Sequence, residues 1–356
     1  MQRVLGIETS CDETAAAVVD LEGNVLGETV HSQIELHARI GGIVPELAAR
    51  DHARNIDAVV RRALDLAEVA LDDVDAIAVT ARPGLVGALL VGVEFAKGLS
   101  LGSGKPLIEV DHLIGHILAI HLRRSGPGAS LVHQTPVFPF LSLLVSGGHT
   151  GIYRVEGPRA EDIVELGATR DDAAGEAFDK VGKALGLGYP GGPVIDRLAK
   201  TGDASRFPFA SPMPSKKSAE FSFSGLKTQV MRFLESHGPL SETELADVCA
   251  SFQKAVVDVL TSKLVAAAER EDVTRIAIGG GVAANRELRE RITDLGVKKG
   301  LTVILPELAS ATDNAAMIAY AGALGFSRGE CASLDLDPST ETSIAAQTRK
   351  GRGQRG

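Results

Sequence analysis

The N-terminal part of the chain shows short apolar runs separated by polar loops and tight turns. Apolar or extended stretches cover residues 4–7, 15–20 and 24–30, with a polar loop over residues 8–14 and the turn Glu22-Gly23 between them. Runs of this length bounded by turn residues are typical of strands. We therefore expect the chain to begin with three strands that are connected by one polar loop and one tight turn.

Helical periodicity then alternates with further strands. Apolar residues recur at helical spacing from Ile56 to Ala67, and Pro45 lies near the expected start of that helix. Alternation of strands and helices is typical of an α/β sheet with crossover helices. The other elements predicted here are strands over residues 75–80 and 107–110, a helix over residues 84–97, and a helix that carries His112, His116 and Leu118.

The opening pattern recurs in the middle of the chain. A buried strand is predicted over residues 137–145, a small polar loop over 146–150, a strand over 151–155 and an extended segment over 163–166. The second polar loop holds the same place in this series as the loop over residues 8–14 does in the first. We interpret this as an internal duplication of topology. The alternative is that two unrelated β-hairpins share the pattern.

The last third of the chain again alternates strands with helices. Three consecutive glycines, residues 279–281, separate a strand from a helix, and Thr312 has the side chain of a helix N-cap. The basic, glycine-rich residues 349–356 are expected to be disordered. The elements predicted in this part are strands over residues 275–278 and 302–305 and helices over residues 283–291 and 313–322.

Composition and charge narrow the class of protein. The chain has 356 residues, of which 44% are hydrophobic and 23% charged, and this length favours two lobes of a globular protein. The net charge of −9 predicts that a nucleic-acid partner would need a local basic patch or a basic surface on another subunit. The absence of Trp argues against recognition by stacked aromatic platforms.

Cysteine usage and the N-terminal residues indicate a cytoplasmic protein. Cys11, Cys249 and Cys331 are widely spaced and odd in number, which excludes a disulfide framework and fits a reducing compartment. The first residues contain Arg3 and several acidic side chains and no apolar run of a signal sequence. The longest apolar stretches are about half the length of a membrane span, so we expect no membrane association.

Two histidines stand four residues apart in the segment DHLIGH, residues 111–116. On a helix this spacing places both imidazoles on one face, close enough to hold one metal ion. The alternative is two ordinary polar helix residues. A zinc peptidase of the HExxH type has Glu directly after the first histidine, whereas this chain has Leu113 there. The pattern therefore permits a metal site but disfavours peptide hydrolysis by that mechanism.

Two glycine-containing loops are candidates for binding an anion. Ser146-Gly147-Gly148 and residues 279–281 follow buried strands, and the missing Cβ atoms let backbone N–H groups approach a ligand closely. Neither loop matches a Walker A or GxGxxG motif. The alternative for each is a tight turn. Acidic residues at loop or helix-start positions are further candidates for a functional site, although each could instead be a helix cap or a solvated charge. These residues are Asp12, Glu13, Asp179 and Asp313.

Nine segments in order resemble the TsaD family of tRNA adenosine threonylcarbamoyltransferases. The resemblance extends from about residue 3 to residue 325, and the histidine pair, the SGGHT loop and the ATDN turn are its most specific parts. The segments are GIETSCDET (6–14), GIVPE (42–46), HLIGH (112–116), LVSGGHT (144–150), DDAAGEAFD (171–179), YPGG (189–192), FSFSGLK (221–227), GGGVAAN (279–285) and ATDN (311–314).

The resemblance implies an α/β fold of the actin-like (ASKHA) type, with two duplicated ribonuclease-H-like lobes and a cleft between them. The expected N-terminal lobe covers residues 1–130 and the C-terminal lobe residues 131–312. A returning helix over residues 313–335 is expected to pack on the first lobe, and residues 336–356 are expected to form a disordered tail.

The resemblance also implies an activity. The family transfers threonylcarbamoyl from threonylcarbamoyl-AMP to N6 of adenosine 37, in tRNAs that read codons beginning with A, and releases AMP. Such a protein acts in the cytoplasm with a TsaB-like paralogue and a TsaE-like ATPase. It binds one divalent metal per subunit, which is expected to be Fe²⁺, with zinc as an alternative in purified protein.

Site residues follow from the matching positions of the family motifs. His112, His116 and Asp313 match the metal ligands, whose open coordination positions would accept a substrate oxygen. Asp12 or Glu13 is the candidate to accept the proton of the incoming amine. The matching substrate-binding residues are Leu144, Val145, Ser146, Gly147, Gly148, Asp179, Gly192, Asp196 and Asn285.

Three other functions are weighed against the transferase. A small-molecule kinase of the same fold would share the glycine loops but has no use for a histidine pair with a remote aspartate. A metallopeptidase lacks its usual base because of Leu113. A regulatory ATP-binding scaffold acting through partners would not depend on the histidines.

Overall fold

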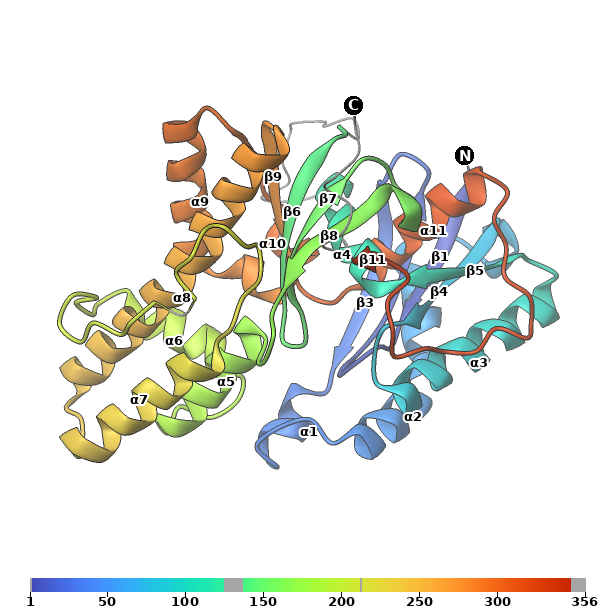
Figure 1. The fold of residues 1–356 in the computed structure, drawn as a ribbon. Helices are drawn as coiled ribbons and strands as arrows, with labels where there is room; N and C mark the ends of the chain where they lie inside the picture. Colours follow the sequence, from blue (N-terminus) through green and yellow to red (C-terminus); the bar gives the residue numbers. More distant parts are fainter. Residues whose placement is uncertain (1, 125–136, 212, 347–356) are drawn as a thin grey trace. The chain divides into compact units, whose positions relative to one another are not determined.

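The structure is a computed structural model that describes residues 2–124, 137–211 and 213–346 (Figure 1). The chain folds into two units, each of which combines one β-sheet with helices. Each unit is assembled from separate parts of the sequence. Unit 1 comprises Met1–Val137, Pro158–Ala160 and Pro306–Ile344, and unit 2 comprises Phe138–Gly157, Glu161–Leu305 and Ala345–Gly356.

Unit 1 is built on a five-stranded sheet with the strand order β3-β2-β1-β4-β5. Its first three strands form an antiparallel meander, and β4 and β5 run parallel to β1. The apolar runs predicted as strands near the N-terminus are therefore confirmed as strands. The bounds are β1 (Arg3–Glu8), β2 (Glu13–Asp20), β3 (Val25–Ser32), β4 (Ala76–Arg82) and β5 (Leu107–Asp111).

Helices cover both faces of the unit 1 sheet. On one face Leu5 and Ile7 join a buried apolar core with residues of α2 and α3. On the other face Gly6 lies against α11, where a Cβ atom would come within 2.5 Å of the Ala315 carbonyl oxygen. Because successive residues of β1 face opposite sides of the sheet, α2 and α3 pack on one side and α11 packs on the other. The helices are α1 (Ile34–Ala38), α2 (Pro45–Leu66), α3 (Val86–Ser103), α4 (His112–Leu118), α10 (Leu308–Ala311) and α11 (Ala315–Ser327), with 3₁₀ turns at Leu71–Asp73 and Ala119–His121.

Unit 2 is built on a six-stranded sheet with the order β10-β9-β6-β7-β8-β11. Its longest helix, α8, packs against α6 and α9 and begins with a capping box in which Ser241 and Glu244 bond each other's backbone N–H. The elements are β6 (Phe140–Val145), β7 (Thr150–Val155), β8 (Ile163–Ala168), β9 (Arg275–Gly279), β10 (Thr302–Ile304), β11 (Ala345–Ala346), α5 (Ala174–Ala184), α6 (Gly191–Ala199), α7 (Ser224–His237), α8 (Glu242–Glu271) and α9 (Arg286–Lys299), with 3₁₀ turns at Ala160–Asp162 and Gly281–Ala284.

The predicted duplication of topology is confirmed. In unit 2, β6, β7 and β8 form an antiparallel meander, β6 pairs in parallel with β9, and β9 pairs in parallel with β10. This is the arrangement of β1 to β5 in unit 1, with β11 added at one edge. The loop between β1 and β2 and the loop between β6 and β7 therefore occupy equivalent places in the two sheets.

Several predicted element boundaries were wrong. The strand expected over residues 137–145 begins at Phe140, directly after Pro139, because proline cannot donate to a strand ladder. The helix expected from residue 283 begins at Arg286, after a 3₁₀ turn and the N-cap Asn285. The helix expected from residue 313 begins at Ala315 with Asn314 as its N-cap, rather than Thr312.

The C-terminal segment departs from the expectation of a disordered tail. Residues 336–346 are described, and residues 336–344 belong to unit 1, where the Ser339 amide donates to the Ala81 carbonyl oxygen at 2.9 Å. Ala345 and Ala346 form β11, which pairs with β8 of unit 2. Asp111 accepts hydrogen bonds from the Thr342 hydroxyl and the Ser343 amide, both at 2.7 Å. This part of the expected tail is ordered because a buried carboxylate binds a side-chain hydroxyl and a backbone amide of the segment. Residues 349–356, predicted to be disordered, lie outside the described residues.

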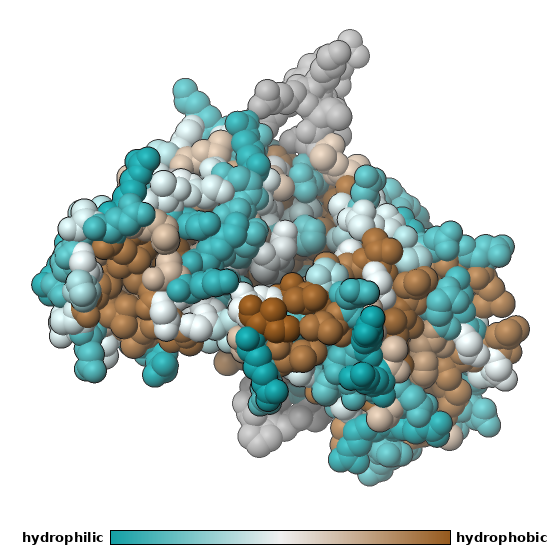
Figure 2. Space-filling model, turned by 90° about the horizontal axis from the view of Figure 1, so that it is seen from below, coloured by the Kyte–Doolittle hydropathy of each residue, from teal (hydrophilic) through white to brown (hydrophobic). Residues whose placement is uncertain are grey.

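One helix among the described residues, α3, is long and apolar enough to cross a membrane by length and composition. It packs against α2 and β4 in unit 1, and a core helix of a soluble protein meets the same criterion. Hydrophobic residues also reach the surface elsewhere, and the face seen from below presents them between hydrophilic side chains (Figure 2). A single helix of this kind is weak evidence for a membrane span.

Candidate active site

The short helix α4 carries the two predicted metal ligands. It begins directly after β5, and its N-cap Asp111 accepts a hydrogen bond from the Leu113 amide at 2.9 Å. His112 and His116 are one turn apart and both buried, with ring centroids 4.6 Å apart and ring planes at 86°. The histidine pair therefore shares one face of a helix, as the spacing predicted.

Asp313 reaches the same place from a distant part of the sequence. Its Oδ1 atom lies 2.9 Å from Nε2 of His116 and 3.5 Å from Nε2 of His112. The three side chains can each offer one ligand atom such that these atoms lie within 4.8 Å of one another. The structure thus brings together the three residues that the sequence motifs assigned to a metal.

Small residues allow α11 to bring Asp313 close to α4. Asn314 caps α11 by accepting from the Met317 amide at 3.0 Å, which places Asp313 immediately before the helix. Gly115 faces α11, where a Cβ atom would come within 3.0 Å of a methyl carbon of Ile318. The glycine in the HLIGH segment is therefore explained by close packing between α4, which carries both histidines, and α11, which begins just after Asp313.

A fourth polar residue, Glu8, holds His112 from the opposite side. Glu8 ends β1, is 1% exposed, and has Oε2 at 2.9 Å from Nδ1 of His112 and 2.6 Å from the Thr80 hydroxyl that donates to it. Its other carboxylate oxygen accepts from the Ser10 amide, and the Ser10 hydroxyl lies 3.1 Å from Nδ1 of His112. Sequence reasoning missed this role, although an acidic residue at the end of a buried strand was the available signal.

Charges in this cluster strongly affect each other. Burial opposes a charge on His112, yet the carboxylates of Glu8 and Asp313 raise its pKa well above the ordinary value. Against the effect of burial, His112 in turn holds the pKa of Asp313 well below its usual range and lowers the pKa of Glu8. Burial lowers the pKa of His116. The cluster therefore favours positive charge at its centre, as a cation site requires.

The donor set fits a divalent transition metal. Two imidazole nitrogens and one carboxylate oxygen suit iron or zinc and leave coordination positions open. The bond between Nδ1 of His112 and Glu8 fits a second condition, because a ligating histidine usually binds a carboxylate or carbonyl through its other ring nitrogen. Nδ1 of His116 is buried without a hydrogen-bond partner among the described residues. Within the described chain, the three-residue cluster is a possible metal site.

The candidate proton acceptors lie in the loop between β1 and β2. Asp12 is 8% exposed, and its carbonyl oxygen accepts from the Gln33 amide at 2.9 Å. Burial, together with the charges of Asp313 and Asp12, raises the pKa of Glu13 to about 10. A carboxyl group with this pKa keeps its proton at neutral pH, so Glu13 is suited to donate a hydrogen bond rather than to accept a proton.

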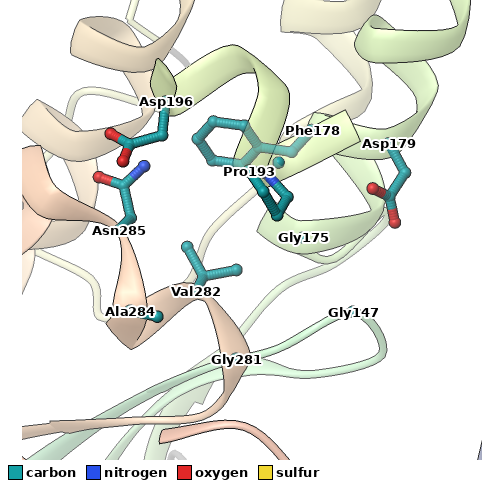
Figure 3. Close-up of a pocket in the computed structure, with 11 residues that line it drawn as sticks. Gly147, Gly175, Phe178, Asp179, Pro193, Asp196, Gly281, Val282, Ala284 and Asn285 are labelled. Carbon is teal, nitrogen blue, oxygen red and sulfur yellow. The ribbon is translucent and has the colours of Figure 1, made fainter. Parts of the chain in front are cut away.

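Unit 2 contains a separate pocket of about 300 Å³. Glycines and apolar side chains supply most of its wall, while Asp196 and Asn285 lie beside each other on one side and Asp179 lies on the opposite side (Figure 3). Asp179 also accepts a hydrogen bond from the Gly191 amide at 2.8 Å. The lining residues are Gly147, Gly175, Phe178, Asp179, Gly192, Pro193, Asp196, Gly281, Val282, Ala284 and Asn285.

The predicted substrate-binding residues divide into two groups. Gly147, Asp179, Gly192, Asp196 and Asn285 line the pocket. Leu144, Val145, Ser146 and Gly148 do not, since the first two are buried in β6 and Ser146 closes a turn in which its hydroxyl accepts from the His149 amide at 3.0 Å. Sequence reasoning missed the apolar lining residues Phe178, Pro193 and Val282, whose side chains carried no chemical signal.

Solved structures of low sequence identity share the fold of this chain. Component A of the (R)-2-hydroxyglutaryl-CoA dehydratase of Acidaminococcus fermentans is 13% identical, with a TM-score of 0.53 over 92% of this chain and 100% of that one. HypF of T. kodakarensis is 14% identical, with a TM-score of 0.56 over 94% of this chain and 49% of that one. The chain has the actin-like (ASKHA) fold that the motifs predicted.

Sequence relatives identify the family within this fold. The family model for tRNA N6-adenosine threonylcarbamoyltransferase, TsaD, matches residues 24–320. A protein of that name from Sorangium cellulosum is 58% identical over 99% of this chain and 100% of its own length. Another from Thermosipho africanus is 49% identical over 92% of this chain and 95% of its own length. The chain belongs to the TsaD family, which confirms the predicted family.

Proposed function

We propose that this protein transfers the threonylcarbamoyl group from threonylcarbamoyl-AMP to N6 of adenosine 37 in tRNAs that read codons beginning with A. The observation that carries the proposal is the convergence of His112, His116 and Asp313 in a chain that belongs to the TsaD family. These three residues come from two separate parts of the sequence and meet in a buried cluster with an anionic neighbour, Glu8.

We propose iron(II) as the metal that His112, His116 and Asp313 hold, with zinc as a substitute in purified protein. When bound, such an ion withdraws charge from a substrate carbonyl oxygen and helps to position the acyl group. Glu8 keeps the proton of His112 on Nδ1, so that Nε2 faces Asp313 and is free to bind. Both imidazoles are buried and the Asp313 side chain is 21% exposed, so water has limited access to the three groups.

The unit 2 pocket is proposed to bind the adenylate part of the donor substrate. Its glycines, including Gly147 and Gly281, leave backbone close to the cavity, and its wall offers apolar contacts for a base. Asp196 is an acceptor for ribose hydroxyls, and Asn285 completes the polar side of the pocket. AMP held in this way is a stable leaving group.

Transfer requires one bond to form and one to break. The N6 amine attacks the carbamoyl carbon, the bond from that carbon to the AMP phosphate oxygen breaks, and the amine loses a proton. We propose Asp12 as the proton acceptor, since Glu13 has a pKa of about 10 and hydrogen-bonds Asp12. Replacing Asp12 and Glu13 by Ala separately tests this assignment. Near-normal transfer with bound tRNA in the Asp12→Ala protein would remove Asp12 from the mechanism.

Partner proteins are proposed to complete the activity. The net charge of −9 is unfavourable for binding tRNA over the whole surface, so a basic surface on another subunit would supply attraction. We propose a TsaB-like paralogue and a TsaE-like ATPase in this role, and a cytoplasmic location for the assembly.

Reconstitution in vitro tests the whole proposal. Purified protein, the two partners, threonylcarbamoyl-AMP and transcribed tRNA are combined, and the tRNA is digested for nucleoside analysis. Threonylcarbamoyladenosine is expected with the wild-type chain and is expected to be absent with His112→Ala. Unmodified tRNA in every reaction, with all components shown to be folded, would overturn the proposal.

The alternative functions are less well supported. Leu113, which is 1% exposed, occupies the position where a peptidase of the HExxH type has its base, so the site lacks a group to activate water there. A sugar or acetate kinase of the same fold would not require the histidine cluster. The relatives that match over nearly the whole chain are named as threonylcarbamoyltransferases. A regulatory scaffold would retain its function in the His112→Ala protein.

A further inference from the structure

Gln253, in the middle of α8, links the polar residues of the unit 2 pocket although it does not line the pocket itself. Its side chain is fully buried. The Nε2 group donates to Oδ1 of Asp196 at 3.1 Å and to Oε2 of Glu287 at 2.9 Å, while Oε1 accepts from Nδ2 of Asn285 at 2.7 Å. One amide thus connects residues of α6, α9 and the turn between β9 and α9.

Hydrogen bonding determines the orientation of this amide. Oδ1 of Asn285 accepts from the Leu288 amide at 2.9 Å as the N-cap of α9, so the Asn285 amide group must point its Nδ2 toward Gln253. Gln253 can then present only its oxygen to Asn285, which turns both protons of Nε2 toward the two carboxylates. In this single orientation of the amide, both Nε2 protons and the Oε1 atom of Gln253 have hydrogen-bond partners.

The hydrogen bond from Gln253 determines which carboxylate oxygen of Asp196 is available to a ligand. Oδ1 of Asp196 is occupied by Gln253, whereas its other carboxylate oxygen has no hydrogen-bond donor among the described residues. Asp196 and Asn285 lie next to each other in the pocket wall (Figure 3). The rest of the wall consists of glycines, apolar side chains and Asp179 on the opposite side. A fixed carboxylate oxygen in such a wall is suited to accept from a hydroxyl group of the ligand.

We propose that Gln253 is a positioning residue that makes the pocket selective for a ribonucleotide over a 2′-deoxyribonucleotide. It holds Asp196 in the one rotamer that can accept from the vicinal hydroxyls of ribose. The inference rests on the proposed function, in which this pocket binds the adenylate. Without Gln253, Asp196 and Asn285 are free to turn or to bond one another, and the hydroxyl groups lose a preorganised acceptor.

The test compares binding of AMP and 2′-deoxy-AMP by calorimetry. Wild-type protein is expected to bind AMP about tenfold more tightly, because bound 2′-deoxy-AMP would cover the carboxylate oxygen of Asp196 without giving it a hydroxyl partner. Gln253→Met, of similar size but without polar atoms, is expected to weaken AMP binding about tenfold and to leave 2′-deoxy-AMP within about twofold. The ratio between the two ligands should fall to near one.

Control variants keep the test decisive. Lys254→Met changes the next, exposed residue of α8 and is expected to preserve the wild-type ratio. Gln253→Glu keeps the shape but sets a third carboxyl group beside Asp196 and Glu287, so it should also lower the ratio; it replaces Gln253→Met if that protein does not fold. Equal losses for both nucleotides, or an unchanged ratio, would overturn the role of Gln253. Wild-type protein that binds neither nucleotide would instead contradict the proposed function.

Discussion

The two units share one topology but carry opposite chemistry. In unit 1 the ends of β1 and β5 bring Glu8 and the histidines of α4 into a buried cluster of charged groups. In unit 2 the loop after β6 and the turn after β9 contribute Gly147 and Gly281 to a pocket with few polar groups. Equivalent strand ends position both sites, as is common in α/β sheets. The topology therefore determines where a site forms, and the residues after each strand determine what it can bind.

The two units also differ in their buried histidines. Among the described residues, the buried histidines all belong to unit 1: His37, His52, His112, His116 and His121. The unit 2 pocket is lined largely by glycines and apolar residues instead, and Gly175 packs so closely against the Ser146 carbonyl that a Cβ atom would come within 2.6 Å of the oxygen. Substitutions can show whether the two sites depend on their different chemistry.

The largest effect is expected from Asp313→Ala. Loss of the one carboxylate ligand should reduce bound metal from about one ion per chain to near zero and lower transfer by at least about a hundredfold. Metal analysis of the purified protein measures this directly, and AMP affinity should stay within about twofold if the unit 2 pocket acts separately. Asp335→Ala, at an exposed position of unit 1, is the matched control. A full metal complement in the Asp313→Ala protein would contradict the assigned ligand.

A smaller effect on the same site is expected from Glu8→Gln. Removing the negative charge behind His112 should weaken metal affinity by about tenfold to a hundredfold, as measured by competition with a chromophoric chelator. Thr80→Val removes only one hydrogen bond to Glu8 and should weaken affinity much less. Equal affinity of the Glu8→Gln and wild-type proteins would show that Glu8 does not orient the ligand.

The unit 2 pocket should respond to Gly175→Ala. The added methyl group meets the Ser146 carbonyl and the Cα atom of Gly147, so the loop must shift and AMP affinity should fall about tenfold. Metal content should be unchanged. Gly225→Ala adds a methyl group to open space near the start of α7 and should leave AMP affinity unchanged. Wild-type AMP binding by the Gly175→Ala protein would mean that the position of this loop is unimportant.

Acid should destabilise unit 1 through His121. Burial and, to a smaller extent, the nearby Arg123 lower the pKa of His121 to about 4, below its unfolded value of about 6.5. The unfolded chain therefore binds this proton first, and the contribution of His121 is lost as the pH falls from about 6.5 toward 4. The free energy of unfolding should drop by about 2 kcal/mol from this residue between pH 7 and pH 5.

Denaturant titration of His121→Gln at both pH values checks this prediction. The variant should show a smaller drop than the wild type, while His237→Gln in unit 2 should keep the wild-type drop. The same acid loss in the His121→Gln and wild-type proteins would assign the effect to other groups.

Local patterns predicted much of the fold and part of the site. Periodicity indicated the strands and their duplication, and a four-residue spacing indicated that His112 and His116 share a helix face. The start of α11 was misplaced because Thr312 and Asn314 both have capping side chains, and the choice between them depends on packing of α11 against β1.

Long-range contacts were beyond such patterns. The position of Asp313 beside His116 joins residues 197 apart, and it was expected only from a family motif. Glu8 and His112 are 104 apart, and Gln253 bonds residues of three other segments. No local propensity encodes these pairs, because they form only when packed helices and strands bring them within hydrogen-bonding distance.

The discontinuity of unit 1 has a consequence for synthesis of the protein on the ribosome. Pro306–Ile344 completes this unit, and it includes Asp313 and the hydroxyl groups that bind Asp111. The nascent N-terminal segment therefore lacks α11 over one face of its sheet until unit 2 has been translated. The N-terminal part of unit 1 therefore cannot complete its fold, and that apolar face stays uncovered, until Pro306–Ile344 has been synthesised. We expect a chaperone requirement to be greater for this nascent segment than for unit 2.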